Sequence, residues 1–311
     1  MKKWIDSNYH YMVPEVDGSS RVNADLSDFV ADVKRGVEFL GAKSATPVVL
    51  GPVTIVRLAN FATTFVPFQN PEALLGALLP VYTQLFKDLK ALGVVEVQLH
   101  EPALGFDEAG LLPLFKKAYP SIFHVGGPAI NMVSFFEDIG HEQYKWLTSL
   151  DEVSIISLDF TRGDNLALVE KYGFPSAKTL GFGIIDGRNV WKVDPRSTED
   201  CLRKLADKGA TAIRVQPSSS LQFVPWDLAS EKDILSQPGV GQVLSFAVQK
   251  IAEVALVAKV ARGEATLGDH KAAWSAYRAM LVGDKSVSDR VGECFLMIRR
   301  KRYHKTFRPN P

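Results

Sequence analysis

The chain has 311 residues, of which 46% are hydrophobic, with 36 Lys and Arg against 35 Asp and Glu. These values predict a globular protein with a sizeable core and leave no overall charge that would attract nucleic acid or an anionic membrane. Cys201 and Cys294 are too few for a disulfide framework or a cysteine-based zinc site, which favours a reducing compartment. We therefore expect a cytoplasmic protein.

Several classes of function are poorly supported by the sequence. Residues 1–16 contain no apolar run of the length that a signal peptide needs, and no window approaches the roughly 20 apolar residues of a membrane span. No P-loop, GxGxxG or G-x-S-x-G motif is present, and basic and aromatic residues are not interleaved as in nucleic-acid-binding proteins. The partners that we expect are therefore a small-molecule substrate and other proteins.

Strand-like and helical segments alternate along the chain, which predicts βα units and a parallel sheet. Seven segments have strand character: residues 4–13, 47–58, 94–104, 121–127, 153–160, 179–185 and 211–219. Helical spacing of apolar residues is found at 26–42, 79–93, 199–209 and 243–265. We predict a single TIM-like (β/α)8 barrel over residues 1–265, followed by a C-terminal helical extension and basic tail over 266–311.

Polar residues follow four of the predicted strands. They are His100 with Glu101, His124, Asp159 and Ser218–Ser220. Parallel α/β barrels place their chemistry at the C-terminal ends of strands, because the loops there vary without disturbing the packed interior. These residues are therefore candidates for the reaction site, with His100, Glu101 and Asp159 as candidate catalytic residues.

Several stretches resemble one known family: KWIDSNYHYMVPEV, VVLGPVTIVRL, VVEVQLHEPAL, KTLGFGIIDGRNVW and PSSSLQFVPWDL. Together they resemble the N-terminal barrel of the cobalamin-independent methionine synthases, from about Lys3 to about Ala255. The resemblance implies a TIM-like fold. It also implies methyl transfer from a methyltetrahydrofolate polyglutamate to homocysteine, whose thiol is activated by zinc in the family's second, C-terminal barrel.

Three departures from the family pattern bear on this resemblance. The chain starts at the KWIDSNYHY segment, without the family's preceding strand and helical hairpin, which predicts a barrel with its first strand missing or replaced. The zinc-bearing second barrel is absent. The family's IDEPAL motif reads LHEPAL here, so that His100 replaces an aspartate, and the family's Ser-Cys-Ser reads Ser218–Ser220.

The substitutions suggest a rebuilt metal site. If the strand faces point inward, His100 and His124 converge with Asp159 or Glu101 at the barrel mouth. Two histidines and one carboxylate can hold Fe(II) or Zn. The alternative is that both histidines are hydrogen-bonded residues of the barrel interior, and that Glu101 anchors the loop that follows it.

Other polar residues are candidates for substrate binding: Asp6, Asn8, His10, Arg188, Asn189, Ser218, Ser219 and Ser220. Arg188 could hold a carboxylate bidentately, although residues 186–189 are also typical of a turn. The serine run could equally cap a helix. The basic tail, Arg299–Lys305, is either a solvated end or a partner contact, or it places Phe295–Ile298 as the missing strand.

Three functions follow from these observations. The first is a methionine-synthase-like one-carbon enzyme or subunit that uses methyltetrahydrofolate and homocysteine with a zinc-bearing partner. The second is an independent Fe or Zn enzyme acting on a small amino-acid-like or sulfur-containing substrate. The third is a non-catalytic subunit that supplies half of a folate cleft. A partner that supplies the missing strand and a homo-oligomer both remain open.

Overall fold

The structure is a computed structural model that describes residues 1–7, 9–17, 21–61, 71–106, 110–235 and 240–283. It divides into two compact units, Met1–Gly187 with Asp200–Ser220, and Arg188–Glu199 with Leu221–Pro311. None of the helices in the described ranges combines the length and apolar character that a membrane span requires. The boundary after residue 265 stays a prediction, and the basic tail lies outside the described residues.

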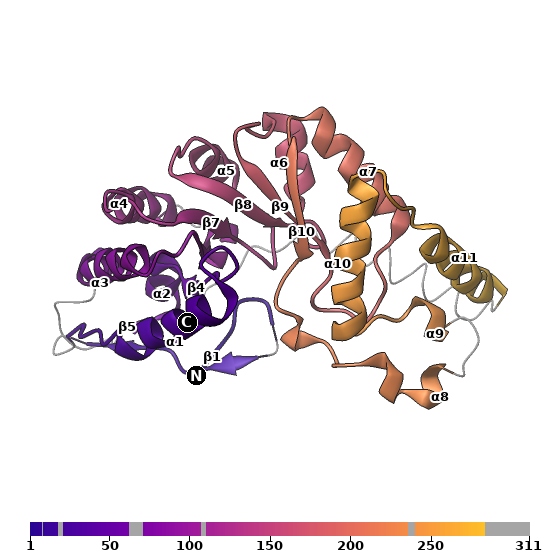
Figure 1. The fold of residues 1–311 in the computed structure, drawn as a ribbon, viewed down its shortest axis with the longest axis horizontal. Coiled ribbons are helices and arrows are strands. Elements are labelled where there is room, and N and C mark those ends of the chain that lie inside the picture. The colour runs from indigo at the N-terminus through magenta and orange to yellow at the C-terminus, as the bar shows by residue number, and fades with distance from the viewer. Residues whose placement is uncertain (8, 18–20, 62–70, 107–109, 236–239, 284–311) are drawn as a thin grey trace, which may run out of the picture. The chain divides into compact units, whose positions relative to one another are not determined.

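A six-stranded parallel sheet forms the core of the first unit, in the order β10-β9-β8-β7-β6-β4 (Figure 1). Its strands are β4 (Val48–Leu50), β6 (Glu96–His100), β7 (Ala129–Val133), β8 (Val153–Asp159), β9 (Thr179–Ile185) and β10 (Ala212–Pro217). The crossover helices are α3 (Pro71–Ala91), α4 (Leu111–Phe123), α5 (His141–Thr148), α6 (Asn165–Tyr172) and α7 (Pro195–Asp207). The predicted α/β fold with a parallel sheet is confirmed.

Shorter elements complete the two units. The first unit contains β1 (Lys2–Lys3), β2 (His10–Tyr11), β3 (Glu15–Val16), β5 (Asn60–Phe61), α1 (Ser27–Leu40), α2 (Pro52–Leu58) and a 3-10 turn at Pro102–Gly105. The second contains 3-10 turns at Leu221–Phe223 and Leu228–Ser230, then α8 (Lys232–Leu235), α9 (Val240–Val243), α10 (Ala247–Ala261) and α11 (Gly268–Gly283). The predicted helices at 26–42, 79–93, 199–209 and 243–265 are confirmed as α1, α3, α7 and α10.

The two faces of the parallel sheet differ in chemistry. The outer face is apolar and fully buried, with Val97, Leu99, Ile130, Met132, Ile156, Leu158, Leu180 and Phe182, and the crossover helices α3 to α6 follow one another along the outside of the sheet (Figure 1). The residues that alternate with these along each strand form the inner face. They are Glu96, Gln98, His100, Asn131, Ser157, Gly181, Arg214 and Gln216. Period-two alternation thus separates an apolar layer from a polar one.

An ion pair across the inner face shows that the sheet curls. The Arg214 guanidinium on β10 donates to the two carboxylate oxygens of Glu96 on β6, at 2.6 and 2.9 Å. Three strands lie between β6 and β10. In a flat sheet these strands would be roughly 19 Å apart, too far for the two side chains to meet. The sheet therefore curves toward its inner face, as in a TIM-like barrel, while β4 and β10 are not paired with each other among the described residues.

Two predicted strands near the N-terminus are wrong in part. Within residues 4–13, only His10 and Tyr11 form a strand, β2, which pairs with β1 in antiparallel. Residues 4–7 turn, and both Ser7 Oγ and the Ser7 N–H donate to the Trp4 carbonyl there. Residues 47–58 contain the short strand β4 and then helix α2, which begins at Pro52 directly after Gly51. Proline suits the first turn of a helix because its missing N–H would have no partner there.

The predicted strand at 121–127 is also wrong. Helix α4 continues through Ile122 and Phe123, and the strand that follows is β7, which starts at Ala129. The helix persists beyond Pro120 because Ile122 and Phe123 are buried, and the His124 N–H donates to the Pro120 carbonyl at 3.0 Å.

Replacing Gly181 with Ala is expected to destabilise the protein by about 2–3 kcal/mol. A Cβ at Gly181 would lie 2.0 Å from Ser157 Oγ and 2.8 Å from Ser157 Cα, so the backbone itself must move. The matched control is Gly76→Ala in α3, where nothing lies within 4 Å of the new Cβ. That variant should be more stable than the wild type by about 0.5–1 kcal/mol. Equal effects of the two variants in urea denaturation would contradict the prediction.

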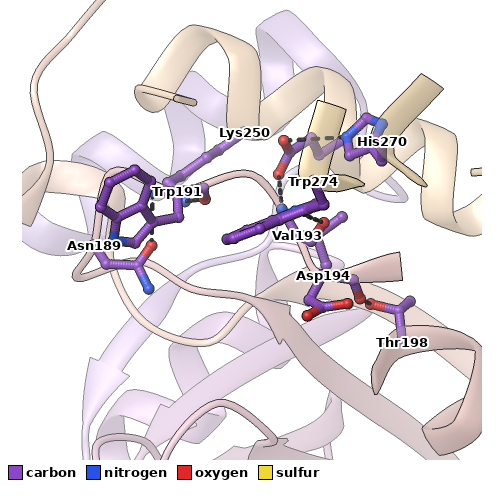
Figure 2. A network of polar contacts seen from close by, with 9 residues as sticks. Asn189, Trp191, Val193, Asp194, Thr198, Lys250, His270 and Trp274 are labelled. Carbon is purple, nitrogen blue, oxygen red and sulfur yellow. Dashed lines mark hydrogen bonds and ion pairs between the residues drawn. The ribbon is translucent and has the colours of Figure 1, made fainter. Parts of the chain in front are cut away.

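The second unit is organised by polar contacts around the segment that precedes α7 (Figure 2). The buried Lys250 Nζ donates to the Trp191 carbonyl at 2.8 Å, and Glu253 Oε2 accepts from the Val193 N–H at 3.2 Å. Trp274 Nε1 donates to the Val193 carbonyl at 3.2 Å. These bonds satisfy the carbonyls of Trp191 and Val193 and the Val193 N–H, and they tie the segment to α10 and α11.

Candidate functional site

The C-terminal end of β6 carries His100 on the inner face of the sheet. Its imidazole packs edge-on against Phe135, with ring centroids 5.5 Å apart, and His100 Nε2 lies 3.2 Å from Gln98 Oε1. Burial lowers the pKa of His100 to about 4. The ring is therefore neutral near pH 7 and can donate or accept one hydrogen bond at each nitrogen, according to its tautomer.

Glu101 is turned away from the strand ends and is fully buried. Its Oε1 accepts from the Val53 N–H at 3.0 Å and from Tyr119 Oη at 2.6 Å, and its Oε2 accepts from the N–H and hydroxyl of Thr54. The carboxylate thus caps the N-terminus of α2, although Glu101 is 47 and 48 positions away from the capped residues in the sequence. The helix dipole favours negative charge at this end of a helix. Gly51 is required beside it, because a Cβ there would lie 2.1 Å from Glu101 Cδ.

Asp159 ends β8 and is 1% exposed. Its Oδ1 accepts from the N–H and hydroxyl of Thr161, both at 2.7 Å, and from the Arg162 N–H at 3.0 Å, while Oδ2 accepts from the Phe136 N–H at 3.0 Å. Burial raises the pKa of Asp159, and these hydrogen bonds oppose the shift. The carboxylate ties together the loops that follow β7 and β8.

The predicted metal set does not come together. His124 follows α4 and precedes β7, whereas His100 ends β6, so the two histidines lie at opposite ends of parallel strands, about 13 Å apart along the strand direction. The oxygens of Glu101 and Asp159 already accept protein hydrogen bonds. Within the described ranges, no three His, Cys, Asp or Glu side chains could hold a metal ion. The residues therefore do not fit the rebuilt Zn or Fe site.

Because His124 is remote from the strand ends, His124→Ala should leave the metal content of the purified protein unchanged. The check is elemental analysis of the wild type and of His124→Ala, both purified without chelator. His124 is exposed, so the variant should also keep the wild-type stability within about 0.5 kcal/mol. A full equivalent of zinc or iron that is lost with His124 would contradict this placement.

The remaining predicted residues of the first unit are the serines that follow β10 and three polar residues near the N-terminus. Ser218 Oγ accepts from the Gly187 N–H at 3.2 Å, Ser219 is buried with its hydroxyl unpartnered in the structure, and Ser220 is exposed. Asp6 forms an ion pair with Arg162 at 3.3 Å, which joins the β1–β2 turn to the loop after β8. His10 is exposed on β2, and Asn8 lies outside the described residues.

Arg188 and Asn189 belong to the second unit. Asn189 Oδ1 accepts from the Trp191 N–H at 3.0 Å and so closes a local turn, which Figure 2 shows beside the Trp191 ring. This agrees with the turn that residues 186–189 predict. A role for Arg188 and Asn189 in substrate binding stays a prediction.

The sequence interpretation missed Asn131, Gln216 and Phe135. Asn131 and Gln216 lie on the inner face of the sheet, where Ser157 Oγ donates to Asn131 Oδ1 at 2.7 Å and lies 3.2 Å from Gln216 Oε1. Phe135 lies beyond β7, between His100 and Trp4, with ring centroids 5.5 and 6.2 Å away. Asn131 could have been found from the alternation in AINMV, which follows the Gly126–Gly127 turn.

Comparisons with known proteins agree with this fold and these motifs. A family model for the N-terminal domain of the cobalamin-independent synthases matches residues 1–210. A 5-methyltetrahydropteroyltriglutamate–homocysteine methyltransferase from Trichodesmium erythraeum is 44% identical over 266 residues, which cover 85% of this chain and 34% of the relative. The relative of the same name from Bacillus velezensis is 35% identical, over 92% of this chain and 37% of its own length. The chain thus spans about a third of the curated relatives that it matches.

The fold itself is also found among solved structures. A B12-independent methionine synthase from Shewanella sp. W3-18-1, in complex with selenomethionine, aligns with a TM-score of 0.54 at 17% identity, over 81% of this chain and 71% of that one. At this identity the likeness concerns the fold alone. The family match over residues 1–210 and the identity to the curated relatives carry the assignment: the chain belongs to the cobalamin-independent methionine synthase family, in which it corresponds to the N-terminal domain.

Proposed function

We propose that the chain takes part in methyl transfer from a methyltetrahydrofolate polyglutamate to homocysteine, together with a zinc-bearing partner in the cytoplasm. The observation that carries this proposal is the 44% identity to a relative named for that reaction. Zinc bound by the partner would lower the pKa of the homocysteine thiol and favour the nucleophilic thiolate. This chain would hold the methyl donor and keep water from it.

The three catalytic candidates and the segment around β2 receive roles under this proposal. Glu101 and Asp159 are positioning residues, because protein donors occupy their oxygens. His100 is the candidate to touch the substrate, since its neutral imidazole ends β6 beside Phe135. The ion pair with Arg162 positions Asp6, in the turn that leads to His10 on β2, to contribute to substrate binding.

The test is reconstitution. The full chain is mixed with the C-terminal half of the Trichodesmium erythraeum relative, and methionine formation from methyltetrahydropteroyltriglutamate and homocysteine is measured. The mixture should form methionine at least ten times faster than either protein alone. A rate no higher than that of the C-terminal half alone would reject the proposal.

A second candidate, a non-catalytic folate-cleft subunit, is favoured by the complete hydrogen bonding of both buried carboxylates. The reconstituted system separates the two with His100→Gln. If His100 contributes to the reaction, kcat falls at least tenfold. If the chain supplies only a cleft, KM for methyltetrahydropteroyltriglutamate changes while kcat stays at the wild-type value.

A further inference from the structure

The inner face of the parallel sheet carries a connected row of amide and hydroxyl groups. Gln98 on β6 is the paired neighbour of Asn131 on β7, and Ser157 on β8 contacts both Asn131 and Gln216 on β10. Gly181 on β9 makes this possible, because any Cβ there would occupy the place of Ser157 Oγ. Packed TIM barrels fill the same positions with bulky branched side chains. The row is therefore polar where packing alone would favour apolar residues.

The row holds a buried donor that has no acceptor. Asn131 is 1% exposed, and its Nδ2 has no hydrogen-bond partner in the structure. A buried amide N–H without an acceptor destabilises the folded state and calls for a bound group that accepts from it. Gln98 and Gln216 are half-buried beside Asn131, so their amides can turn toward such a group.

The charged groups around the row are already compensated. Glu96 and Arg214 neutralise each other, and Asp159 accepts four hydrogen bonds from its own loops. His100 is neutral near pH 7, because burial lowers its pKa to about 4. A ligand with a net charge would lose its hydration and find no free counter-charge in the row, which favours an uncharged ligand.

Aromatic rings stand next to the row. His100 shares the inner face with Gln98 and packs against Phe135, which in turn lies 6.2 Å from the Trp4 ring. Flat rings favour stacked or edge-on contact with another flat ring. A primary amide carries an N–H donor beside a carbonyl acceptor. It can therefore form two hydrogen bonds with a heterocycle edge that carries an acceptor beside a donor, as Asn and Gln do with adenine.

We propose that the amide row of Gln98, Asn131, Ser157 and Gln216 binds an uncharged planar heterocycle whose edge carries both N–H donors and oxygen or ring-nitrogen acceptors. Pterins and purines share this chemistry. The pterin case rests on the proposed function, whereas the purine case does not. Binding at the row needs neither homocysteine nor a partner, since all four side chains come from this chain.

The probes are 6-hydroxymethylpterin and guanosine, titrated into the full chain by isothermal calorimetry without homocysteine or a partner protein. At least one should bind. Gln98→Leu and Gln216→Leu should each weaken that binding at least tenfold. The matched control is Gln84→Leu, which removes an exposed amide on α3 that donates only to Asp88, and it should leave binding unchanged. Circular dichroism checks that each variant is folded.

Two results would overturn the proposal: neither probe binds the wild type, or both row variants bind as tightly as Gln84→Leu. Failure of methyl transfer in the reconstituted mixture leaves the heterocycle titration unaffected, so the two proposals fail separately.

Discussion

Glu101→Ala is expected to lower the free energy of unfolding by about 3–5 kcal/mol. The substitution leaves the N–H groups of Val53 and Thr54 and the Tyr119 hydroxyl without their acceptor in a fully buried site. Urea denaturation followed by circular dichroism measures the effect. Glu72→Ala is the control, since its 2.8 Å ion pair with Lys117 is exposed and should contribute less than about 1 kcal/mol.

The same carboxyl gives a pH dependence whose sign is fixed by its pKa. Burial raises the pKa of Glu101 from 4.5 to about 7, so the folded state binds this proton more tightly than the unfolded chain. The stabilisation is full below pH 4.5 and is lost as the pH rises through 7, by about 3 kcal/mol. Glu101→Gln keeps the shape and removes the titration. The difference in stability between wild type and Glu101→Gln should therefore change across this interval, and a constant difference would contradict the assignment.

Asp159→Ala is expected to destabilise the protein by about 2–4 kcal/mol, because three buried or half-buried backbone N–H groups lose their acceptor. One of them belongs to Phe136, whose φ of 77° lies in the left-handed region that a phenylalanine rarely adopts. The hydrogen bond from Phe136 to Asp159 helps to hold that conformation. Hydrogen exchange should show faster exchange at Phe136 and Thr161 in the variant, together with the loss of global stability.

Asp88→Asn serves as the control for Asp159, because the hydrogen bond that Asp88 accepts from Gln84 on the same helix is exposed. Its effect should stay within about 0.5 kcal/mol. Asp159→Asn should lower the stability nearly as much as Asp159→Ala. In either orientation of the introduced amide, its NH2 group would face a backbone N–H donor, that of Phe136 or those of Thr161 and Arg162. Unchanged exchange at Phe136 in Asp159→Ala would show that the loop is held by other contacts.

The central strands could be predicted from the sequence because their apolar and β-branched composition is typical of buried strands. Residues 153–159 and 179–185 are rich in apolar and β-branched residues, and both are largely buried strands in the structure. Residues 47–58 have a similar composition, but VTIVRL is helical because Pro52 starts a helix whose first N–H groups are held by Glu101, 47 and 48 positions along the chain. Local patterns contain no trace of a cap supplied from so far away.

The candidate site shows the same limit. His100 and Asp159 were placed correctly at strand ends, because their strands were identified correctly. His124 was misplaced because residues 121–127 resemble a strand that ends in a Gly turn, although packing of Ile122 and Phe123 continues α4 to this point. The roles of Glu101 and Asp159 depend on which backbone donors lie around them, and those donors come from loops and helices that only the folded chain brings together.

The strand order of the sheet has a consequence for synthesis on the ribosome. Each strand of the parallel sheet lies beside the strand that precedes it along the chain in that sheet, so βα units can be added to one growing edge as they emerge. The Glu96–Arg214 ion pair joins residues 118 positions apart, and it cannot form until β10 has been translated. A nascent chain therefore carries an uncompensated Glu96 on its inner face until Arg214 has been translated, and the arrival of Arg214 both neutralises that charge and draws β10 toward β6 across the three strands between them.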